Sequence, residues 1–525
     1  METRSQKLKV TRTNRKIDMK KKKKELKKVL YDSALALCEQ IELRNTVVVK
    51  ASSPELTDEI IEAYSADYRA NSNNELRRNI ISELGVENSS LNRDYLQQIN
   101  KAYSHNLPKV PRVASQYYSG RCWLFAATNM MRTYMIADLN LNDHFELSEA
   151  YLFFWDKLER AHNFLETMLD FRNKDSHDAI YNHCLFNLSP VNDGGNWSYV
   201  CNLVQKYGVV PKTVYGESFN SSYSDEMNEV LHTKLCLFNT WIRNNTDVPK
   251  QDVRKKIVRE MMPEIYALLA SCLGEPPKPQ GEFVWEYNEA GENFESSRQK
   301  GQYCRVEGLS PLQFYDTYVK PFLNLDEMVH LVHDPREENP KNRTYRVDHS
   351  GQMVGGMPEI MFNVDMDVMR VATAASIMEN NPVWFACDVG KDFEPFSSFL
   401  ATEAFQRDKV LGTELSISKE DGLRNLVSYP THAMTFVGLN TTENDPELVT
   451  KWKVENSWGE NGYDLDDPGY LHMTDAWFRR NVYSVIVNIK YLPLSLRAEF
   501  MDNKYIPITL PYNDPLSSVA KIKIH

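Results

Sequence analysis

The chain has 525 residues, of which 42% are hydrophobic and 25% charged, and its formal net charge is −11 at pH 7. This composition is ordinary for a soluble globular protein, and the length allows several domains. No apolar run approaches the roughly 20 residues needed to cross a membrane, so a membrane-spanning class is excluded.

The charge is unevenly distributed along the chain. Residues 1–28 contain 13 Lys and Arg against three acidic residues, which gives +10 and leaves −21 for the remainder. The five consecutive lysines from Lys20 to Lys24 repel one another, so we expect residues 1–52 to be a partly disordered basic extension. A nuclear-localisation or polyanion-binding segment is the alternative to a solvated tail. The acidic remainder argues against a nucleic-acid surface spread over the fold.

Cysteine usage indicates the compartment. Eight cysteines are scattered without a Cys-x-x-Cys pair, so zinc-ribbon spacing is absent and reduced thiols are expected. The N-terminus has no apolar stretch after its charges, so no secretory signal is expected. We therefore expect a cytoplasmic protein, with a nuclear fraction if the lysine run acts as a localisation signal.

The body of the protein, residues 53–525, is expected to begin with a helix. Ser53-Pro54 is typical of an N-cap followed by proline at the first helical position. Prolines within residues 101–119 predict an extended loop. Apolar periodicity and start signals then predict helices over residues 122–140, from 146 onward, over 199–207 and within 220–275.

The second half of the sequence changes character. Prolines and glycines predict turns over residues 276–310. Apolar runs and alternation then predict strands at residues 383–389, 434–439, 451–455, 470–473 and 482–489. Helices first and strands later favour an α+β fold over an α/β fold.

Residues 116–125, Gln-Tyr-Tyr-Ser-Gly-Arg-Cys-Trp-Leu-Phe, place Cys122 at the start of an apolar helix. In the first turn, free N–H groups and the helix dipole favour a thiolate. Beside a protonated histidine, a cysteine pKa can fall from about 8.5 to roughly 3.5–7.5. A buried helical cysteine is the more common explanation of such a residue taken alone, so catalysis needs a base and an orienting group elsewhere.

Two later motifs supply those partners. His432 opens a predicted strand, and Asn456 begins the motif Asn-Ser-Trp-Gly. A nucleophilic cysteine needs an imidazole within hydrogen-bond reach, and the imidazole needs a partner that fixes its tautomer. The order Cys122, His432, Asn456 is that of papain-like peptidases. We assign these residues as nucleophile, general acid–base and orienting group.

Further residues are expected to support this triad. The backbone N–H of Cys122 and the side-chain amide of Gln116 are the candidate oxyanion donors. Trp458 is expected to cover the hydrogen bond between His432 and Asn456, and Trp123 is counted with it as a supporting residue.

The chain resembles the bleomycin hydrolase family of papain-like cysteine aminopeptidases. The resemblance covers about residues 53–520 and is carried, in the family's order, by residues 119–123, 151–157, 192–195, 207–209, 353–356, 387–390, 431–436 and 454–459. It implies a homohexameric barrel with internal active sites and hydrolysis of peptide and amide bonds from a free N-terminus, including deamidation of bleomycin. It also implies close approach of the substrate to Gly194 and Gly195.

Cys122 and His432 are 310 residues apart, whereas simple papain-like enzymes have roughly 130–150. The resemblance attributes the excess to a helical insertion, placed at about residues 209–350. It also implies that the C-terminal arm, about residues 508–525, enters the active-site cleft and sets its terminal carboxylate against the ammonium group of the substrate.

The matched part of that arm ends near Ala520, so Lys521 to His525 overrun it. Two alternatives remain open. The enzyme trims or is inhibited by its own tail, which we favour, or the tail folds aside and the protein acts as an endopeptidase.

Other functional classes are weaker. A nucleic-acid-binding protein with secondary peptidase activity would use the basic extension. A transglutaminase-type acyltransferase would favour Asp at the position of Asn456, and an inactive scaffold would not need the intact set. His330 and His333 lack the glutamate of a zinc-protease helix, so neither a metal nor a cofactor is expected.

Overall fold

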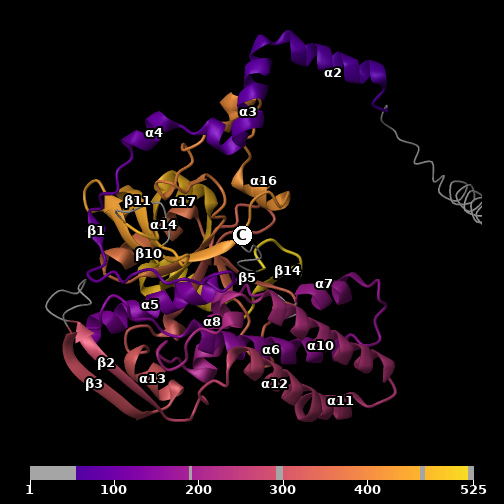
Figure 1. The fold of residues 1–525 in the computed structure, drawn as a ribbon, viewed down its shortest axis with the longest axis vertical. Coiled ribbons are helices and arrows are strands. Elements are labelled where there is room, and N and C mark those ends of the chain that lie inside the picture. Colours follow the sequence, from indigo (N-terminus) through magenta and orange to yellow (C-terminus); the bar gives the residue numbers. More distant parts are fainter. Residues whose placement is uncertain (1–54, 188–191, 291–299, 461–466, 518–525) are drawn as a thin grey trace, which may run out of the picture. The chain divides into compact units, whose positions relative to one another are not determined.

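The computed structural model describes residues 55–187, 192–290, 300–460 and 467–517 (Figure 1). The basic extension, the expected N-cap at Ser53-Pro54 and the tail beyond residue 517 lie outside the described residues. The chain divides into two compact units, Met1–Glu83 and Leu84–His525, and each is described by itself. No helix within the described ranges is long and apolar enough to cross a membrane.

The described part of the first unit is helical. Helix α2 (Asp58–Ala70) begins where the side chain of Thr57 accepts a hydrogen bond from the N–H of Ile60. The helix therefore starts four residues after the expected proline. Helix α3 (Ser72–Ser90) continues across the boundary between the units and is kinked at Gly85, which has φ 75°.

The first part of the second unit contains most of its helices. They are α4 (Arg93–Gln98), α5 (Cys122–Asp138), α6 (Glu149–Asp170), α7 (Ala179–Asn187), α8 (Trp197–Tyr207), α9 (Phe219–Ser222), α10 (Asp225–Asn244), α11 (Lys250–Lys256), the π-helix η1 (Ile257–Met261), α12 (Met262–Leu273) and α13 (Pro311–Tyr318). The expected helices from residues 122, 146 and 199, and the helical stretch within 220–275, are confirmed.

Twelve strands in the described part of the chain form one sheet in the order β14-β5-β6-β4-β13-β7-β10-β11-β12-β9-β8, with β1 paired to β10. The strands are β1 (His105–Asn106), β4 (Met328–Val332), β5 (Arg343–Val347), β6 (Met361–Asn363), β7 (Val383–Cys387), β8 (Phe393–Glu394), β9 (Phe399–Leu400), β10 (His432–Thr441), β11 (Val449–Glu455), β12 (Tyr470–Thr474), β13 (Val482–Asn488) and β14 (Ile508–Leu510). The five predicted strands correspond to β7, β10, β11, β12 and β13. The α+β expectation is confirmed.

Helices also connect and flank these strands. They are the 3-10 helices η2 (Leu325–Glu327), η3 (Pro446–Leu448) and η4 (Ile489–Tyr491), and the α-helices α14 (Met366–Met378), α15 (Arg407–Leu411), α16 (Lys419–Arg424), α17 (Asp475–Asn481) and α18 (Leu494–Asn503).

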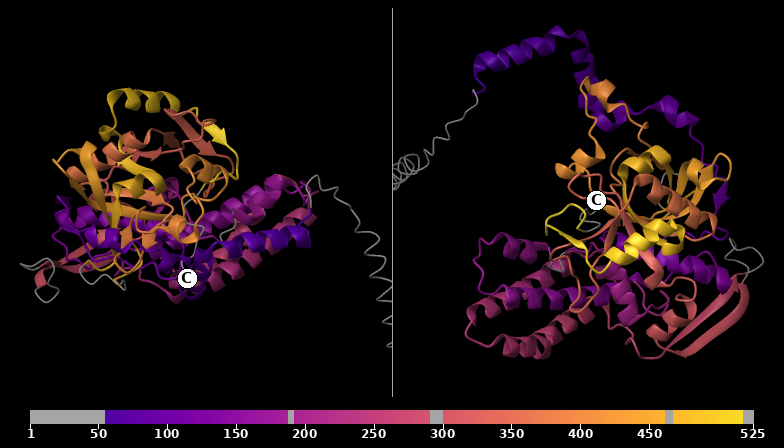
Figure 2. Two further views of the ribbon diagram at one scale, coloured as in Figure 1. Left: turned by 90° about the horizontal axis from the view of Figure 1, so that it is seen from above. Right: turned by 180° about the vertical axis from the view of Figure 1, so that it is seen from behind.

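Helix α5 lies between the sheet and the helices α6, α10 and α12, and the views in Figure 2 show the same separation (Figures 1 and 2). Alternate residues of the central strands face the two sides, as strand geometry requires. Trp384 and Ala386 of β7 belong to the core around α5 and α6, whereas Phe385 belongs to the core on the other face. The start of α5 meets the start of β10, where the N–H of Ala433 donates to the Sγ of Cys122.

The expected helical insertion at about residues 209–350 contains more than helices. It holds α9 to α13, but also the antiparallel hairpin β2 (Phe283–Ala290) and β3 (Lys300–Leu309), and strands β4 and β5. The prolines and glycines of residues 276–310 predicted turns, and the hairpin was missed. Trp285 of β2 is buried against Phe314 of α13, so this contact, distant in sequence, stabilises it.

Candidate active site

Cys122 is the first residue of α5 and is completely buried. Arg121 precedes the helix, and no side chain caps its first N–H groups. The backbone N–H of Ala433, the residue after His432, donates to the Cys122 Sγ at 3.4 Å. The Oγ1 of Thr435 donates to the carbonyl of Ala126 at 2.9 Å and holds β10 against α5. The helix start and the strand start thus bring the cysteine and the histidine motif together.

The electrostatics of the thiol differ from the expectation. Burial raises the pKa of Cys122 to about 12, although backbone N–H groups of Ala433, Trp123 and Cys122 itself act in the opposite direction. Desolvation disfavours the charged form of a thiol, and here it outweighs the helix start. The expected depression of the thiol pKa is therefore wrong for Cys122 taken alone. A thiolate here needs a positive charge formed beside it.

His432 and Asn456 form the predicted pair. The His432 Nε2 lies 2.9 Å from the Asn456 Oδ1, which also accepts the N–H of Ser457 at 2.8 Å. Because this oxygen can only accept, Nε2 carries the proton and neutral His432 keeps a lone pair on Nδ1. Burial lowers the pKa of His432 to about 4, against the hydrogen bond to Asn456, which raises it.

Trp458 covers this pair as expected. Its ring lies 5.0 Å from the imidazole of His432, measured between centroids, at an interplanar angle of 33°. The ring of Phe393 meets Trp458 edge-on at 5.9 Å. Trp458 therefore covers the imidazole on this side, and Phe393 packs against Trp458.

Gln116 is held beside the triad by the loop that contains Asn456. Its backbone N–H donates to the carbonyl of Ser457 at 2.8 Å, and its Oε1 accepts from the Ser457 Oγ at 2.6 Å. Its Nε2 donates to the carbonyl of Ser119 at 2.6 Å. One amide hydrogen is thus used internally, and the second is the one that an oxyanion would need. The oxyanion role of Gln116 stays a prediction.

The two candidate substrate-binding glycines have structural roles. A Cβ on Gly195 would lie 2.5 Å from the indole of Trp123, and the Trp123 Nε1 donates to the carbonyl of Asp193 at 2.7 Å. The carbonyl of Gly194 accepts from Arg160. The glycine at 195 is therefore needed so that Trp123 can pack against the loop. Substrate contact at either glycine stays a prediction.

Buried ion pairs around the site were not recognised from the sequence. The Lys157 Nζ lies 2.6 Å from the Asp193 Oδ1, and Asp193 also accepts the N–H of Gly120 at 3.1 Å. Arg132 of α5 pairs with Glu455 of β11, and both side chains are buried. The first pair fixes the turn before Cys122, and the second ties α5 to the residue before Asn456. Asp193 and Glu455 lie within the motifs at residues 192–195 and 454–459, and this position was the local signal that could have identified them.

The C-terminal arm runs toward the same region. Asp514 forms a buried ion pair with Arg336 at 3.0 Å. The carbonyl of Ser517 accepts from the Asn196 Nδ2 at 3.1 Å, and Asn196 follows the loop that packs on Trp123. The overrun from Lys521 to His525 lies outside the described residues.

The two histidines considered as metal ligands are used otherwise. The His330 Nδ1 lies 2.5 Å from the Glu359 Oε1, and burial lowers the pKa of His333 to about 3. Among the residues that the structure describes, no group of three or more His, Cys, Asp or Glu is arranged to hold a metal ion.

Comparison with known proteins gives consistent results. The profile of the Peptidase C1-like family matches residues 55–517. Bleomycin hydrolase of Homo sapiens is 35% identical over 436 residues, which cover 82% of this chain and 91% of that protein. Aminopeptidase C of Listeria innocua is 34% identical over 468 residues, 89% of this chain and 100% of that protein. The crystal structure of PepW from Lactobacillus rhamnosis HN001 has a TM-score of 0.81 at 30% identity, and the match covers 89% of this chain and 99% of that one.

Proposed function

The chain belongs to the Peptidase C1-like family and has its papain-like fold, and we propose that it is a cysteine aminopeptidase with the triad Cys122, His432 and Asn456. One observation carries this assignment: His432 is bound through Nε2 to Asn456, while the next residue donates to the Cys122 Sγ. The imidazole nitrogen Nδ1 is left to take the thiol proton. The aminopeptidase assignment is supported by relatives named bleomycin hydrolase and aminopeptidase C.

Catalysis begins with transfer of the thiol proton from Cys122 to the His432 Nδ1. Burial opposes each charge separately, so the thiolate and the imidazolium form together and stabilise one another in the water-poor site. The thiolate then forms a C–S bond to the substrate carbonyl. The C–N bond breaks, and His432 gives its proton to the leaving amine.

Deacylation reverses the proton movement. Water replaces the leaving amine, His432 takes one of its protons, and the resulting hydroxide attacks the thioester carbonyl. The C–S bond breaks and releases the carboxylic acid with the Cys122 thiolate, which is reprotonated. The negative oxygen of each tetrahedral intermediate would be bound by the Cys122 N–H and the second N–H of the Gln116 amide.

The C-terminal arm is the proposed reason for specificity toward a free N-terminus. Asp514 anchors it on Arg336, and Ser517 reaches Asn196, close to the loop against Trp123. A terminal carboxylate carried onward from Ser517 would pair with the ammonium group of a substrate and block longer N-terminal extensions. We favour trimming of the tail near Ala520, or inhibition by it, over release of the arm and endopeptidase activity.

A panel of aminoacyl fluorogenic amides with free and N-acetylated amino groups tests this function. Wild type should hydrolyse the free amides and leave the acetylated ones, because only the free group carries the ammonium charge. Intact mass of wild type beside Cys122→Ala reports trimming, since only the active enzyme could shorten its own tail. A wild type that ends at His525 and cleaves acetylated peptides as fast as free ones would refute the aminopeptidase assignment.

Five further properties are proposals of the same kind. Relatives named bleomycin hydrolase make deamidation of bleomycin a reaction to test. A homohexameric barrel is proposed from the family resemblance, with mass photometry as its test. A cytoplasmic location is supported by the free state of all seven cysteines in the described part of the chain. Binding of nucleic acid by residues 1–28, and a nuclear fraction, would be tested by deleting them; phosphate binding should weaken steeply with salt.

A further inference from the structure

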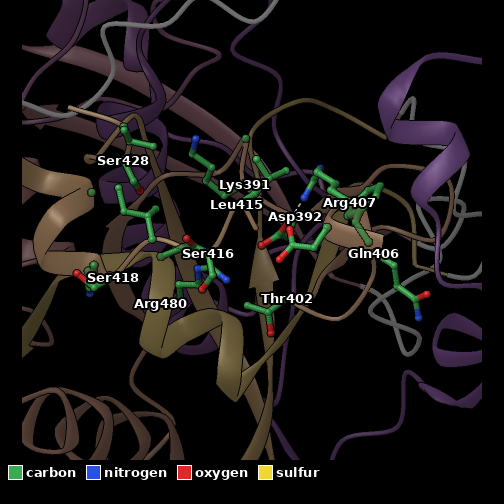
Figure 3. A pocket seen from close by; sticks show the side chains of 18 of the residues that line it. Lys391, Asp392, Thr402, Gln406, Arg407, Leu415, Ser416, Ser418, Ser428 and Arg480 are labelled. Carbon is green, nitrogen blue, oxygen red and sulfur yellow. Dashed lines mark hydrogen bonds and ion pairs between the residues drawn. The ribbon is translucent and has the colours of Figure 1, made fainter. Parts of the chain in front are cut away.

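A cavity lies beside the loop after β7, within the second unit, and none of its lining residues belongs to the triad. Its volume is about 540 Å³. It is lined by the loop after β7, by α15 with its flanking residues, by the start of α16 and by the end of α17 (Figure 3). Figure 3 shows the side chains around it, with Arg407 and Asp392 pointing toward one another.

The cavity carries an excess of positive charge in an otherwise acidic body. Its lining contains four cationic side chains, Lys391, Arg407, Lys409 and Arg480, and three carboxylates, Glu87, Asp392 and Asp408. It also contains Lys419, whose pKa burial lowers to about 7. Residues 29–525 as a whole have a formal charge of −21. A local reversal of sign in a concave surface attracts anions.

Two of the basic side chains, Arg407 and Lys419, have partners within the protein. Arg407 pairs with Glu87 at 2.7 Å and also with Asp392. The Lys419 Nζ donates to the carbonyl of Val482 at 2.5 Å, at the end of α17. The two carboxylates compensate the charge of Arg407, and the hydrogen bond of Lys419 holds its amino group at the end of α17.

Three cations of the lining form no ion pair within the described residues, although the charge of Lys391 acts on the nearby carboxylate of Asp388. Within the ranges that the structure describes, Lys391, Lys409 and Arg480 have no carboxylate within 4.0 Å. Lys391 and Arg480 are contributed by different elements, the loop after β7 and helix α17. Even with the exposed carboxylate of Asp408 counted, the lining has a net positive charge.

The cavity wall is continuous with the surroundings of His432. Lys391 and Asp392 precede Phe393, whose ring packs on Trp458, and Trp458 covers His432. On the same loop, the N–H of Lys391 donates to the carbonyl of Asp388, and an Asp388 oxygen lies 3.4 Å from the Thr431 Oγ1. Since His432 protonates the leaving amine, this wall borders the leaving-group side of the reaction.

We propose that this cavity, the carboxylate pocket, binds a carboxylate of the peptide substrate on the leaving-group side of the scissile bond, through Lys391 and Arg480. The inference rests on the proposed aminopeptidase function. Because an aminopeptidase removes one residue at a time, the rest of the peptide lies on the leaving-group side. The carboxylate is either an acidic side chain or the C-terminus of a short peptide, and the pocket makes the enzyme prefer such peptides.

The test uses full-length protein and peptides of two to six residues with a free N-terminus. Each peptide is compared with its partner that has Gln in place of Glu at one position, or an amide in place of the terminal carboxylate. The readout is the ratio of kcat/KM for the charged and the neutral peptide. We expect a ratio of about three- to tenfold at one position or one length, as for a partly exposed charge pair. Dependence on the Glu position identifies a side chain, and dependence on length with the free C-terminus identifies the terminal carboxylate.

The double variant Lys391→Gln/Arg480→Gln should bring this ratio close to one. Lys255→Gln removes one charge from an exposed lysine of α11, away from the cavity, and should keep the wild-type ratio. In wild type the ratio should also shrink as salt is raised, because the pocket is open to water; this measurement needs no variant. A wild-type ratio near one for every peptide, or a ratio unchanged in the folded double variant, would overturn the proposal.

The failure of the underlying function gives a different result. If neutral peptides are not hydrolysed by wild type, or are hydrolysed equally by Cys122→Ala, the aminopeptidase assignment fails. Hydrolysis of neutral peptides that depends on Cys122 but shows no preference for charge leaves that assignment intact and removes only the carboxylate pocket.

Discussion

The catalytic centre and the carboxylate pocket use ionisable groups in opposite ways. Cys122 and His432 are 0% and 3% exposed. Burial raises the pKa of the Cys122 thiol and lowers the pKa of the His432 imidazole, so each group is favoured in its neutral form. Lys391 and Arg480 line an open cavity, form no ion pair within the described ranges, and have their charges screened by water. The charges in the pocket are therefore permanent, but water weakens their interactions. The charges at the catalytic centre form only during the reaction, and their interactions are strong because the site is buried.

The comparison explains why the two regions need different support. The centre is built from matched partners: Asn456 for His432, and Glu455 for Arg132 of the helix that carries Cys122. Loss of one partner there leaves a buried group without compensation. In the pocket, loss of one cation removes only a screened attraction. Effects should therefore be large at the centre and small at the pocket.

The largest effect is expected for Cys122→Ala. The variant removes the nucleophile, so kcat/KM for a free aminoacyl amide should fall by at least about 10⁴-fold, as for other covalent catalysts. Thermal unfolding should change little, because one small buried group is lost. Cys304→Ala, a partly exposed free cysteine of β3, is the matched control and should keep wild-type turnover. Turnover by Cys122→Ala comparable with the control would break the assignment of the centre.

The next largest effect is expected in stability. Arg132→Met leaves Glu455 buried without its partner, which should lower the free energy of unfolding by about 3–5 kcal/mol in urea denaturation. Arg132→Met/Glu455→Leu removes both charges and should recover most of the loss. Equal losses in the single and double variants would mean that packing, or the hydrogen bonds of Arg132 to the carbonyls of Phe145 and Arg112, matters more than its charge.

A smaller effect is expected from acid. The folded pKa of His432 is about 4, below its ordinary value near 6.5, so the unfolded state binds the proton first. The stability contributed by neutral His432 is complete above pH 6.5, falls as the pH drops, and levels off below pH 4. The full loss is about 3 kcal/mol from the pKa difference.

Urea denaturation between pH 7 and pH 4 checks this sign. His432→Gln should show a shallower loss of stability on acidification than wild type, while His333 and the other buried groups still contribute to both. If the free energy of unfolding falls equally with pH in the two proteins, the site tolerates a protonated imidazole. The catalytic centre would then not differ from the pocket in its response to charge.

The sequence was sufficient for the parts of the site that follow from local patterns. The start of α5 at Cys122, the strand opened by His432 and the turn at Asn456 all have local signals, and their order identified the family. The long-range partners lay within recognised motifs, but nothing local to them showed which residues they pair with. Glu455 reads as an ordinary charged strand residue until β11 is paired and Arg132 is placed opposite it.

The pKa shifts and the hairpin were missed for the same physical reason. Burial is a property of the assembled core. The helix start at Cys122 therefore indicated only one contribution to the pKa of the thiol, and not the direction of the total shift. Strands β2 and β3 are stabilised by packing of Trp285 that periodicity does not reveal. The packing of Gly195 against Trp123, far away in sequence, was not foreseen, and its contact with substrate stays a prediction.

The pH dependence of Cys122 alkylation tests the central claim most directly. Iodoacetamide labelling followed by peptide mass analysis gives the rate for each cysteine in wild type and in His432→Gln. The account predicts that Cys122 reacts faster than the other seven cysteines near pH 6–7, because the imidazolium stabilises its thiolate, and that His432→Gln loses this advantage. Cys122 labelling that appears only at alkaline pH in active wild type, or that is unchanged in His432→Gln, would contradict the ion pair on which the proposed mechanism depends.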